Sequence, residues 1–320
     1  CQAFTGRGGW PLTIFMTPEK QPVYGATYIP RESRSNMIGM LDLLPRIQNI
    51  WKNKREEVLK AADQVVSLIG KTDDRIADGL NKKDLTVAFQ SLEAEFDKTY
   101  GGFGPAPKFP MPHQIMFLLR YSIWSGEKKA VEMVSKTLDL MGSGGIYDQL
   151  GFGFHRYSTD EKWLVPHFEK MLYDQALLSM AYAEAYGMLG FPGYREKAAE
   201  IFRYVLRDMT STDGGFYSAE DADSENEEGK FYLWTLEEIE QTLSLKEAQL
   251  IANIYNIEKE GNYYEPLTGS RSGRNIPHLK KSWLEIASSL GLSEEKLRHR
   301  AKEVQEKLYV AREKRIHPYK

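Results

Sequence analysis

Polar and aromatic side chains that could do chemistry are concentrated between residues 144 and 175 of this sequence. Pyranose rings stack on aromatic faces, and their hydroxyls need directed hydrogen-bond partners. The stretch is therefore typical of a site for a sugar-sized ligand. Its candidate catalytic residues are His155, His167, Glu169 and Asp174, and its candidate substrate-binding residues are Arg156, Tyr157 and Trp163.

His167 and Glu169 follow Pro166, which presets the backbone for a turn or a helix start. The carboxylate could tune the imidazole as an acid–base pair, or both side chains could bond to backbone groups and close the loop. Glu169 and Asp174 are five residues apart and need not share one helix face. No two histidines have the i, i+4 spacing of a helical metal site, so we expect no metal.

Two further segments carry candidate residues. Residues 213–234 read as a β-hairpin between helices, with Glu220 and Asp221 as candidate catalytic acids near its base. The outer acids Glu225, Glu227 and Glu228 are interpreted as a solvated tip. Residues 100–112 are rich in proline and glycine and predict a stiff loop, either a cleft wall or a structural cap. This loop supplies the candidate substrate-binding residues Lys108 and Phe109.

The elements around these loops are predicted to be helical. Glycine pairs at 101–102, 144–145 and 214–215 suit tight reversals at helix ends. Helix hairpins with long insertions favour an α/α toroid over an ordinary multi-helix bundle. Apolar residues at three- and four-residue steps predict helices at 85–98, 111–124, 128–141, 170–189, 194–208, 236–243, 245–255, 279–289 and 293–315.

The first 70 residues have a different pattern. Apolar runs at 11–16 and 23–29 predict an antiparallel hairpin, and a helical stretch follows at 35–70, interrupted at Pro45. The Trp10–Pro11 bond is a candidate for the cis isomer. The polar segment 71–84 predicts a boundary between a domain at 1–72 and another at 84–320. An apolar strand directly beside Cys1 and a charged helix near the last residues predict a chain that is interrupted at both ends.

Charge and cysteine content limit the possible partners. The 42 basic and 45 acidic residues give a net charge of −3, so neither nucleic acid nor an anionic membrane is expected as a partner. No apolar run approaches the ~20 residues of a spanning helix, and we expect a cytoplasmic protein. The single cysteine excludes a disulfide or a dithiol cycle within these residues. The expected partners are a small molecule and, as a further possibility, a protein; no cofactor is expected.

Four long strings carry a family resemblance: CQAFTGRGGWPLTIFMTP at 1–18, GGFGPAPKFP at 101–110, GFHRYSTDEKWLVPHFEKMLYDQ at 153–175 and GGFYSAEDADSENEEGKFYLW at 214–234. They resemble the thioredoxin-domain-containing family of spermatogenesis-associated protein 20 and bacterial YyaL-type proteins. The resemblance covers nearly the whole chain. It implies the end of a thioredoxin-like α/β domain, followed by the first part of a six-hairpin α/α toroid similar to certain glycosidases and sugar epimerases. It also implies a Cys-x-x-Cys motif upstream of Cys1 and further helices after Lys320.

We therefore expect a mainly α protein with one loop-lined cleft, where acid–base groups perform glycoside hydrolysis or sugar epimerisation. The fold analogy itself does not identify a reaction. The alternative function is a thioredoxin-fold redox or protein-interaction module with a non-catalytic toroid. The expected cleft gathers His155, Arg156, His167, Glu169, Asp174, Glu220 and Asp221.

Overall fold

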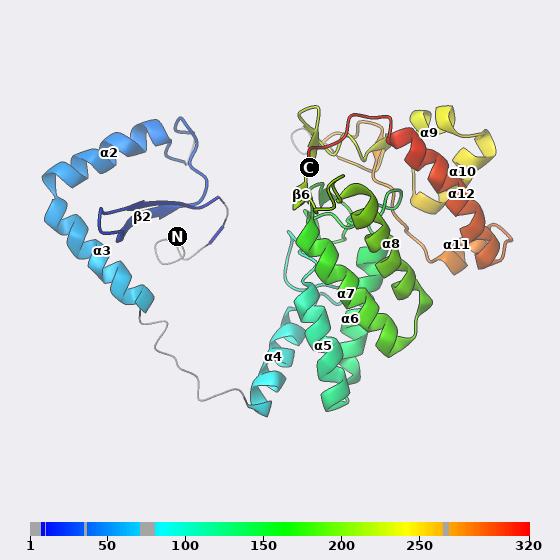
Figure 1. The fold of residues 1–320 in the computed structure, drawn as a ribbon, viewed down its shortest axis with the longest axis horizontal. Coiled ribbons are helices and arrows are strands. Elements are labelled where there is room, and N and C mark those ends of the chain that lie inside the picture. The colour runs from blue at the N-terminus through cyan, green and yellow to red at the C-terminus, as the bar shows by residue number, and fades with distance from the viewer. Residues whose placement is uncertain (1–7, 10, 35–36, 71–80, 265–268) are drawn as a thin grey trace. The chain divides into compact units, whose positions relative to one another are not determined.

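The structure is a computed structural model that describes residues 8–9, 11–34, 37–70, 81–264 and 269–320. Its contacts divide the chain into two compact units, residues 1–81 and 82–320, and each is described by itself. The described residues form eleven helices and ten short strands (Figure 1). The prediction of a mainly α fold with strands near its start is confirmed. Cys1 and the Trp10–Pro11 bond lie outside the described residues.

The first unit begins with the predicted hairpin. Strand β1 (Thr13–Met16) pairs antiparallel with β2 (Pro22–Ala26). Two helices follow, α2 (Met40–Asn53) and α3 (Arg55–Gly70). The predicted interruption at Pro45 is wrong, because α2 continues through this proline and the chain breaks at Lys54 instead. Pro45 is the sixth residue of α2, and its missing N–H removes one backbone hydrogen bond without ending the helix.

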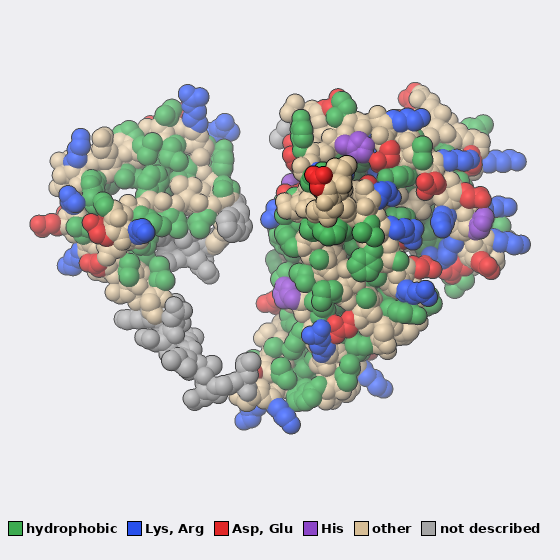
Figure 2. All heavy atoms as spheres, in the orientation of Figure 1, with side chains coloured by type: hydrophobic (Ala, Val, Ile, Leu, Met, Phe, Trp, Pro, Cys, Tyr) green, Lys and Arg blue, Asp and Glu red, His purple; other side chains and the backbone are tan. Residues whose placement is uncertain are grey.

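The first unit leaves much apolar surface uncovered. Leu43 and Ala62 are buried, whereas Met16, Leu41 and Leu44 are 47–54% exposed. Hydrophobic side chains accordingly cover much of this unit in Figure 2. An apolar groove of about 610 Å³ lies between the hairpin and helices α2 and α3.

The second unit begins with helices whose positions agree with the predicted periodic segments. These are α4 (Lys82–Glu95), α5 (Pro112–Ser125), α6 (Lys128–Ser143), α7 (Leu172–Leu189) and α8 (Pro192–Asp208). Proline occupies the first position of α5 and of α8, where no intrahelical N–H bond is lost. Gly126 and Gly190 end α5 and α7 in the left-handed conformation, which glycine adopts without steric cost. The chain therefore reverses between α5 and α6 and between α7 and α8.

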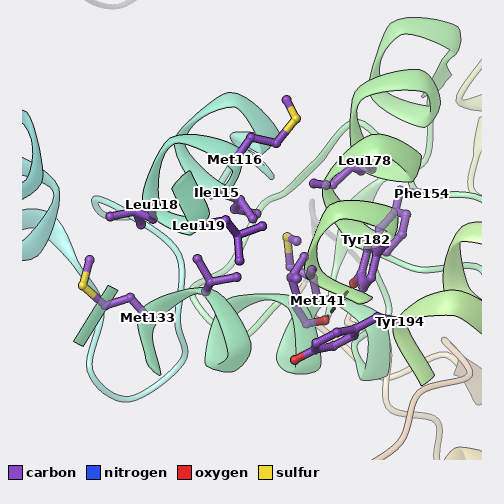
Figure 3. Packing of buried hydrophobic residues seen from close by; sticks show 14 of the residues in the cluster. Ile115, Met116, Leu118, Leu119, Met133, Met141, Phe154, Leu178, Tyr182 and Tyr194 are labelled. Atoms are coloured by element: carbon purple, nitrogen blue, oxygen red, sulfur yellow. Dashed lines mark hydrogen bonds between the residues drawn. The ribbon is translucent and has the colours of Figure 1, made fainter. Parts of the chain in front are cut away.

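The main core of this unit lies among α5, α6 and α7 (Figure 3). Ile115 and Leu119 of α5 face Met141 of α6 and Leu178 of α7, and all four are fully buried. The Tyr182 hydroxyl also donates a 2.8 Å hydrogen bond to the Leu138 carbonyl, which ties α7 to α6. Burial of a large aliphatic side chain contributes about 1.5–3 kcal/mol, so this layer fixes the helices that carry the loops.

The remaining helices pack around a second core. Their bounds are α9 (Leu236–Thr242), α10 (Leu245–Tyr255), α11 (Trp283–Ser289) and α12 (Glu294–Arg312). Three of them begin with a capping box, at Thr235, Ser244 and Ser282. One face of α12 is buried against them through residues at three- and four-residue steps, which are Leu297, Ala301, Val304 and Leu308.

Short strand pairs connect the loops at one end of the second unit. They are β3 (Tyr157–Ser158) with β4 (Pro166–His167), β5 (Lys170–Met171) with β6 (Ala219–Glu220), β7 (Asp223–Ser224) with β8 (Glu227–Glu228), and β9 (Trp234–Thr235) with β10 (Arg274–Asn275). The predicted single hairpin over 213–234 is wrong. Only its tip is a hairpin, with Glu225 and Asn226 at positive φ, while its two ends pair with other segments. Periodicity within one segment cannot reveal such distant partners.

Candidate acid–base site

The β3–β4 ladder places the first site residues. Its register puts Tyr157 opposite His167, and their rings stack with centroids 5.0 Å apart. On the other side, Phe109 packs against Tyr157 at 4.9 Å. The backbone of the preceding residue, Lys108, exchanges two 2.8 Å hydrogen bonds with Ser158, which fixes Phe109 beside the ladder. Phe109 remains 44% exposed and offers a ring to a ligand.

His167 lies between two carboxylates. Its Nδ1 is 2.7 Å from Glu228 Oε1, and its Nε2 is 3.6 Å from Glu169 Oε2. The hydrogen bond with Glu228 raises the pKa of His167, against an opposing effect of burial, and the same bond lowers the pKa of Glu228. Carboxylates at both ring nitrogens favour the doubly protonated imidazolium. This histidine is therefore positioned to hold or donate a proton.

Glu169 is shared between His167 and Arg156. The Arg156 NH1 donates a 2.8 Å hydrogen bond to Glu169 Oε2, and the backbone N–H of Arg156 donates to the Glu169 carbonyl at 2.8 Å. The bond to Glu169 and a second one to Tyr173 outweigh burial and raise the pKa of Arg156. Glu169 thus links an acid–base group to a fixed positive charge.

Asp174 lies in the first turn of α7 and is 7% exposed. Its Oδ2 is buried without a hydrogen-bond partner, and so is Nε of Arg156. Burial raises the pKa of Asp174 to about 7; Arg156 opposes this rise and Glu169 adds to it. A carboxyl that titrates near neutrality suits a general acid or base.

We name this group the acid–base cluster. It contains Arg156, His167, Glu169, Asp174 and Glu228, flanked by the aromatic residues Phe109, Tyr157 and Tyr173. The prediction that Glu228 belongs to a solvated tip without a role in the site is wrong. Glu228 contacts His167, which lies 61 positions away along the chain. The two-residue turn at Glu225 and Asn226 could have indicated a local hairpin that carries Glu228. Nothing in the sequence indicates that the hairpin reaches His167.

Three other candidate residues are buried in the loop framework. Lys108 is 1% exposed, and its ammonium contacts Asp97 and the carbonyls of Gly101 and Glu161. The Trp163 ring is fully buried and donates its N–H to the Tyr100 carbonyl at 2.9 Å, so it presents no face to a ligand.

His155 is 2% exposed and bonds through Nδ1 to the Phe168 carbonyl. Burial lowers its pKa to about 3, and the nearby Lys170 adds to this effect. The imidazole therefore stays neutral at physiological pH, enclosed by the rings of Phe168 and Tyr232.

Glu220 belongs to a second group, which we name the buried ionic network: Asp148, Lys170, Glu220 and Arg312. Asp148 accepts hydrogen bonds of 2.9 Å from both Lys170 and Arg312. Glu220 accepts from the hydroxyls of Tyr204 and Tyr232, at 3.1 and 2.5 Å.

Asp221 is exposed on the loop after β6, and its backbone N–H donates to the Tyr319 carbonyl. The structure thus brings His167, Glu169, Asp174, Arg156, Tyr157 and Phe109 together. The other candidates, His155, Glu220, Asp221, Trp163 and Lys108, have separate surroundings.

The described residues contain neither a metal-binding group nor a membrane-crossing helix. No group of three or more His, Cys, Asp and Glu side chains is arranged there to hold a metal ion. Within the same residues, no helix has both the length and the apolar character needed to cross a membrane. On the face shown in Figure 2, acidic and basic side chains of residues 82–320 are interspersed.

Comparison with known proteins identifies relatives over nearly all of the chain. Residues 1–70 match a family model, Thioredox_DsbH, described as a protein of unknown function. The chain is 38% identical to human spermatogenesis-associated protein 20, over 99% of this chain and 44% of that protein. An uncharacterized protein of Caenorhabditis elegans is 32% identical over 99% of this chain and 46% of its own length. The chain therefore spans less than half the length of these relatives.

The cellobiose 2-epimerase of Spirochaeta thermophila has a more distant structural likeness. It is 19% identical with a TM-score of 0.38, over 43% of this chain and 39% of that protein. A TM-score this low supports no inference. The sequence relatives do support one: this chain belongs to the family that includes spermatogenesis-associated protein 20.

Proposed function

We propose that the acid–base cluster is the active site of a carbohydrate-active domain. The observation that carries this proposal is a pair of buried, unsatisfied groups, the acceptor Oδ2 of Asp174 and the donor Nε of Arg156. Leaving such groups unpaired costs about 1–3 kcal/mol each, so a ligand that satisfies both binds favourably. A hydroxyl both donates and accepts, and it therefore fits a site that offers one donor and one acceptor.

The cluster also provides contacts for the apolar faces of a sugar ring. Phe109 and Tyr173 are 44% and 49% exposed, and Tyr157 lies between Phe109 and His167. Aromatic rings beside a few directed polar groups are the usual composition of a small-ligand site. These features support a sugar-sized substrate over a purely apolar or a highly charged one.

The proposed reaction is proton transfer on the sugar, as in epimerisation or isomerisation. Asp174 has a pKa of about 7, and the pKa of His167 is raised, so both groups can take up and release protons near neutrality. One would remove a proton next to the carbonyl of the open-chain sugar, and the other would return a proton to that carbon or its neighbour. Glycoside hydrolysis remains the second reaction, with Asp174 as the acid and Glu169 as the second carboxyl group.

The test is to incubate the chain with a panel of mono- and disaccharides in deuterated water. Epimerisation or isomerisation predicts new sugar signals and solvent deuterium at carbon in NMR spectra, whereas hydrolysis predicts release of reducing ends. The variants Asp174→Asn and His167→Gln are expected to lose about 10²–10⁴-fold in rate. His113→Gln alters an exposed histidine on α5, outside the acid–base cluster, and serves as the matched control.

Two results would contradict this proposal. One is the absence of both saccharide binding and turnover across the panel. The other is a reaction whose rate is unchanged in Asp174→Asn and His167→Gln.

The domain assignment is a proposal too. We propose that residues 1–72 form the end of a thioredoxin-like domain and that residues 84–320 form the first part of the toroid, in a cytoplasmic protein. The match of residues 1–70 to a thioredoxin-type family model favours redox or protein-interaction chemistry for the first unit as the second candidate function.

A dithiol cycle would need a second thiol from outside these residues, since the sequence contains one cysteine. A disulfide-reductase assay on a longer relative, with each cysteine replaced in turn, tests this candidate. Activity that does not depend on cysteine would exclude it.

A further inference from the structure

A large cavity in the second unit shares no residue with the acid–base cluster. It has a volume of about 1010 Å³ and is lined by parts of α6, α8, α11 and α12. Ligand sites commonly measure about 300–1,000 Å³, so this cavity can hold a sugar-sized molecule with room for a charged substituent. Its lining is polar and aromatic, which distinguishes it from the apolar groove of the first unit.

Three linked side chains line one side of the cavity. The Tyr147 hydroxyl donates a 2.6 Å hydrogen bond to Glu200 Oε2, and Lys197 Nζ is 3.0 Å from the same oxygen. The Lys197 ammonium also lies 3.4 Å from the centroid of the Tyr147 ring. An ammonium has three donors, so Lys197 keeps hydrogen-bonding capacity beyond Glu200. About a fifth of its side chain, 19%, remains exposed toward solvent.

Positive charge exceeds negative charge along the cavity wall. Six lysines and arginines line it, against four aspartates and glutamates. Three of the four acids already form ion pairs: Glu200 pairs with Lys197, and both Glu196 and Glu294 pair with Arg298. Lys281 and Lys302 are exposed at the wall and form no ion pair with any other described residue. Lys280 pairs with Glu258 outside the wall, and Lys281 interacts favourably with Glu285, so the wall carries a small excess of positive charge.

Aromatic rings complete the cavity. Phe191 is 57% exposed. The guanidinium carbon of Arg298 lies 4.8 Å from the centroid of the Trp283 ring. The Tyr194 hydroxyl is hydrogen-bonded to Asp139, and both residues also line the cavity. A ligand ring can stack on these faces while its hydroxyls meet the polar side chains.

We propose that this cavity is a second ligand site, which binds a saccharide carrying an anionic group, either a phosphate or a carboxylate. The basic wall supplies the attraction to the anion, Lys197 supplies hydrogen bonds, and Trp283 and Phe191 supply ring contacts. Binding here does not depend on the chemistry proposed for the acid–base cluster.

The test is to titrate the 320-residue chain with a hexose phosphate, a uronic acid and the matching neutral hexose, followed by calorimetry. We expect both anions to bind more tightly than the neutral sugar and to weaken as ionic strength rises. The double variant Lys281→Ala/Lys302→Ala is expected to weaken anion binding roughly fivefold, as for solvent-screened charges. Both substitutions are at exposed positions and should leave the fold intact.

A control variant separates the cavity from the general surface charge of the chain. Lys246→Ala removes an exposed lysine outside the cavity and should change the affinity by less than about twofold. Weaker anion binding in the double variant, together with near-parent affinity in Lys246→Ala, assigns the anion to this cavity, which shares no residue with the acid–base cluster. Preference for one anion identifies the charged group and supports the proposal. Failure of both anions to bind, equal binding of the neutral hexose, or unchanged affinity in the double variant would overturn it.

Discussion

Asp148 of the buried ionic network and Asp174 of the acid–base cluster are both 7% exposed. Burial alone would raise the pKa of Asp148, but Arg312 and Lys170 hold it well below the usual range. For Asp174 burial dominates and raises the pKa to about 7, because Arg156 compensates only in part. The same residue type at the same exposure is thus a permanent anion in one place and a carboxyl that titrates near neutral pH in the other.

The difference lies in how completely each group is paired. Asp148 accepts hydrogen bonds from two cations and from the backbone N–H groups of Leu150 and Gly151. Asp174 keeps one oxygen buried without a partner. A fully paired carboxylate stabilises the folded chain, whereas an incompletely paired one stores an unfavourable free energy that a ligand can relieve. The comparison therefore supports a structural role for the first group and is consistent with the chemical role that we propose for the second.

The largest expected effect comes from Asp148→Asn. Removing this charge leaves Lys170 and Arg312 buried without their shared anion, and we expect a loss of about 3–5 kcal/mol in the free energy of unfolding. Chemical denaturation measures this loss. Glu306→Gln, at an exposed position on α12, is the control and should change stability by less than about 0.5 kcal/mol. A loss below about 1 kcal/mol for Asp148→Asn would contradict a structural role for Asp148.

Asp174→Asn is expected to act in the opposite direction. Folding raises the pKa of this carboxyl from 3.8 to about 7, so the folded chain binds a proton that the unfolded chain lacks between these values. Its stabilising contribution is present below pH 3.8 and is lost as pH rises through about 7. Above that pH, the asparagine variant should therefore be more stable than the parent by about 1–3 kcal/mol.

The measurement is denaturant unfolding of parent and variant over a pH series. Asp221→Asn, at an exposed aspartate, should follow the parent profile. If Asp174→Asn followed the parent profile as well, the carboxyl of Asp174 would not titrate near neutral pH.

The smallest expected effect is that of Glu228→Gln on His167. The hydrogen bond that His167 donates to Glu228 is the main cause of the raised pKa of this histidine, so the variant should lower that pKa toward 6.5. The pair stabilises the fold below pH 6.5 and loses this contribution as pH rises through the raised pKa. Both side chains are partly exposed, so the stability change should stay below about 1 kcal/mol.

NMR titration of the imidazole measures the shift directly. Glu227→Gln is the matched control, because Glu227 pairs with Arg274 instead of His167. An unchanged His167 pKa in Glu228→Gln would show that Glu228 does not tune this group.

Sequence reasoning predicted the helices better than the site. Apolar periodicity and caps are local signals, and they located α10 at residues 245–255 and α6 within two residues of its end. Pro45 misled the prediction because a proline inside a helix does not always end it.

The site was predicted in part because its residues are close in sequence. Residues 156–174 supply most of the acid–base cluster, so a dense polar stretch was a sufficient signal. Glu228 was missed, since its role depends on a hairpin that reaches another loop. Burial excludes two other candidates from contact with a ligand. Tryptophan and histidine are common in ligand sites, but tertiary packing encloses Trp163 and His155.

The bond between Asp148 and Arg312 also affects the synthesis of the chain, because the two residues are 164 positions apart. At about 5–20 residues per second, a ribosome needs roughly 8–33 seconds to add the residues between them. Throughout that interval Asp148 lacks one of its two cationic partners, while the local helix pairs α5–α6 and α7–α8 can already form. The buried ionic network therefore reaches its final arrangement late, after α12 has been synthesised.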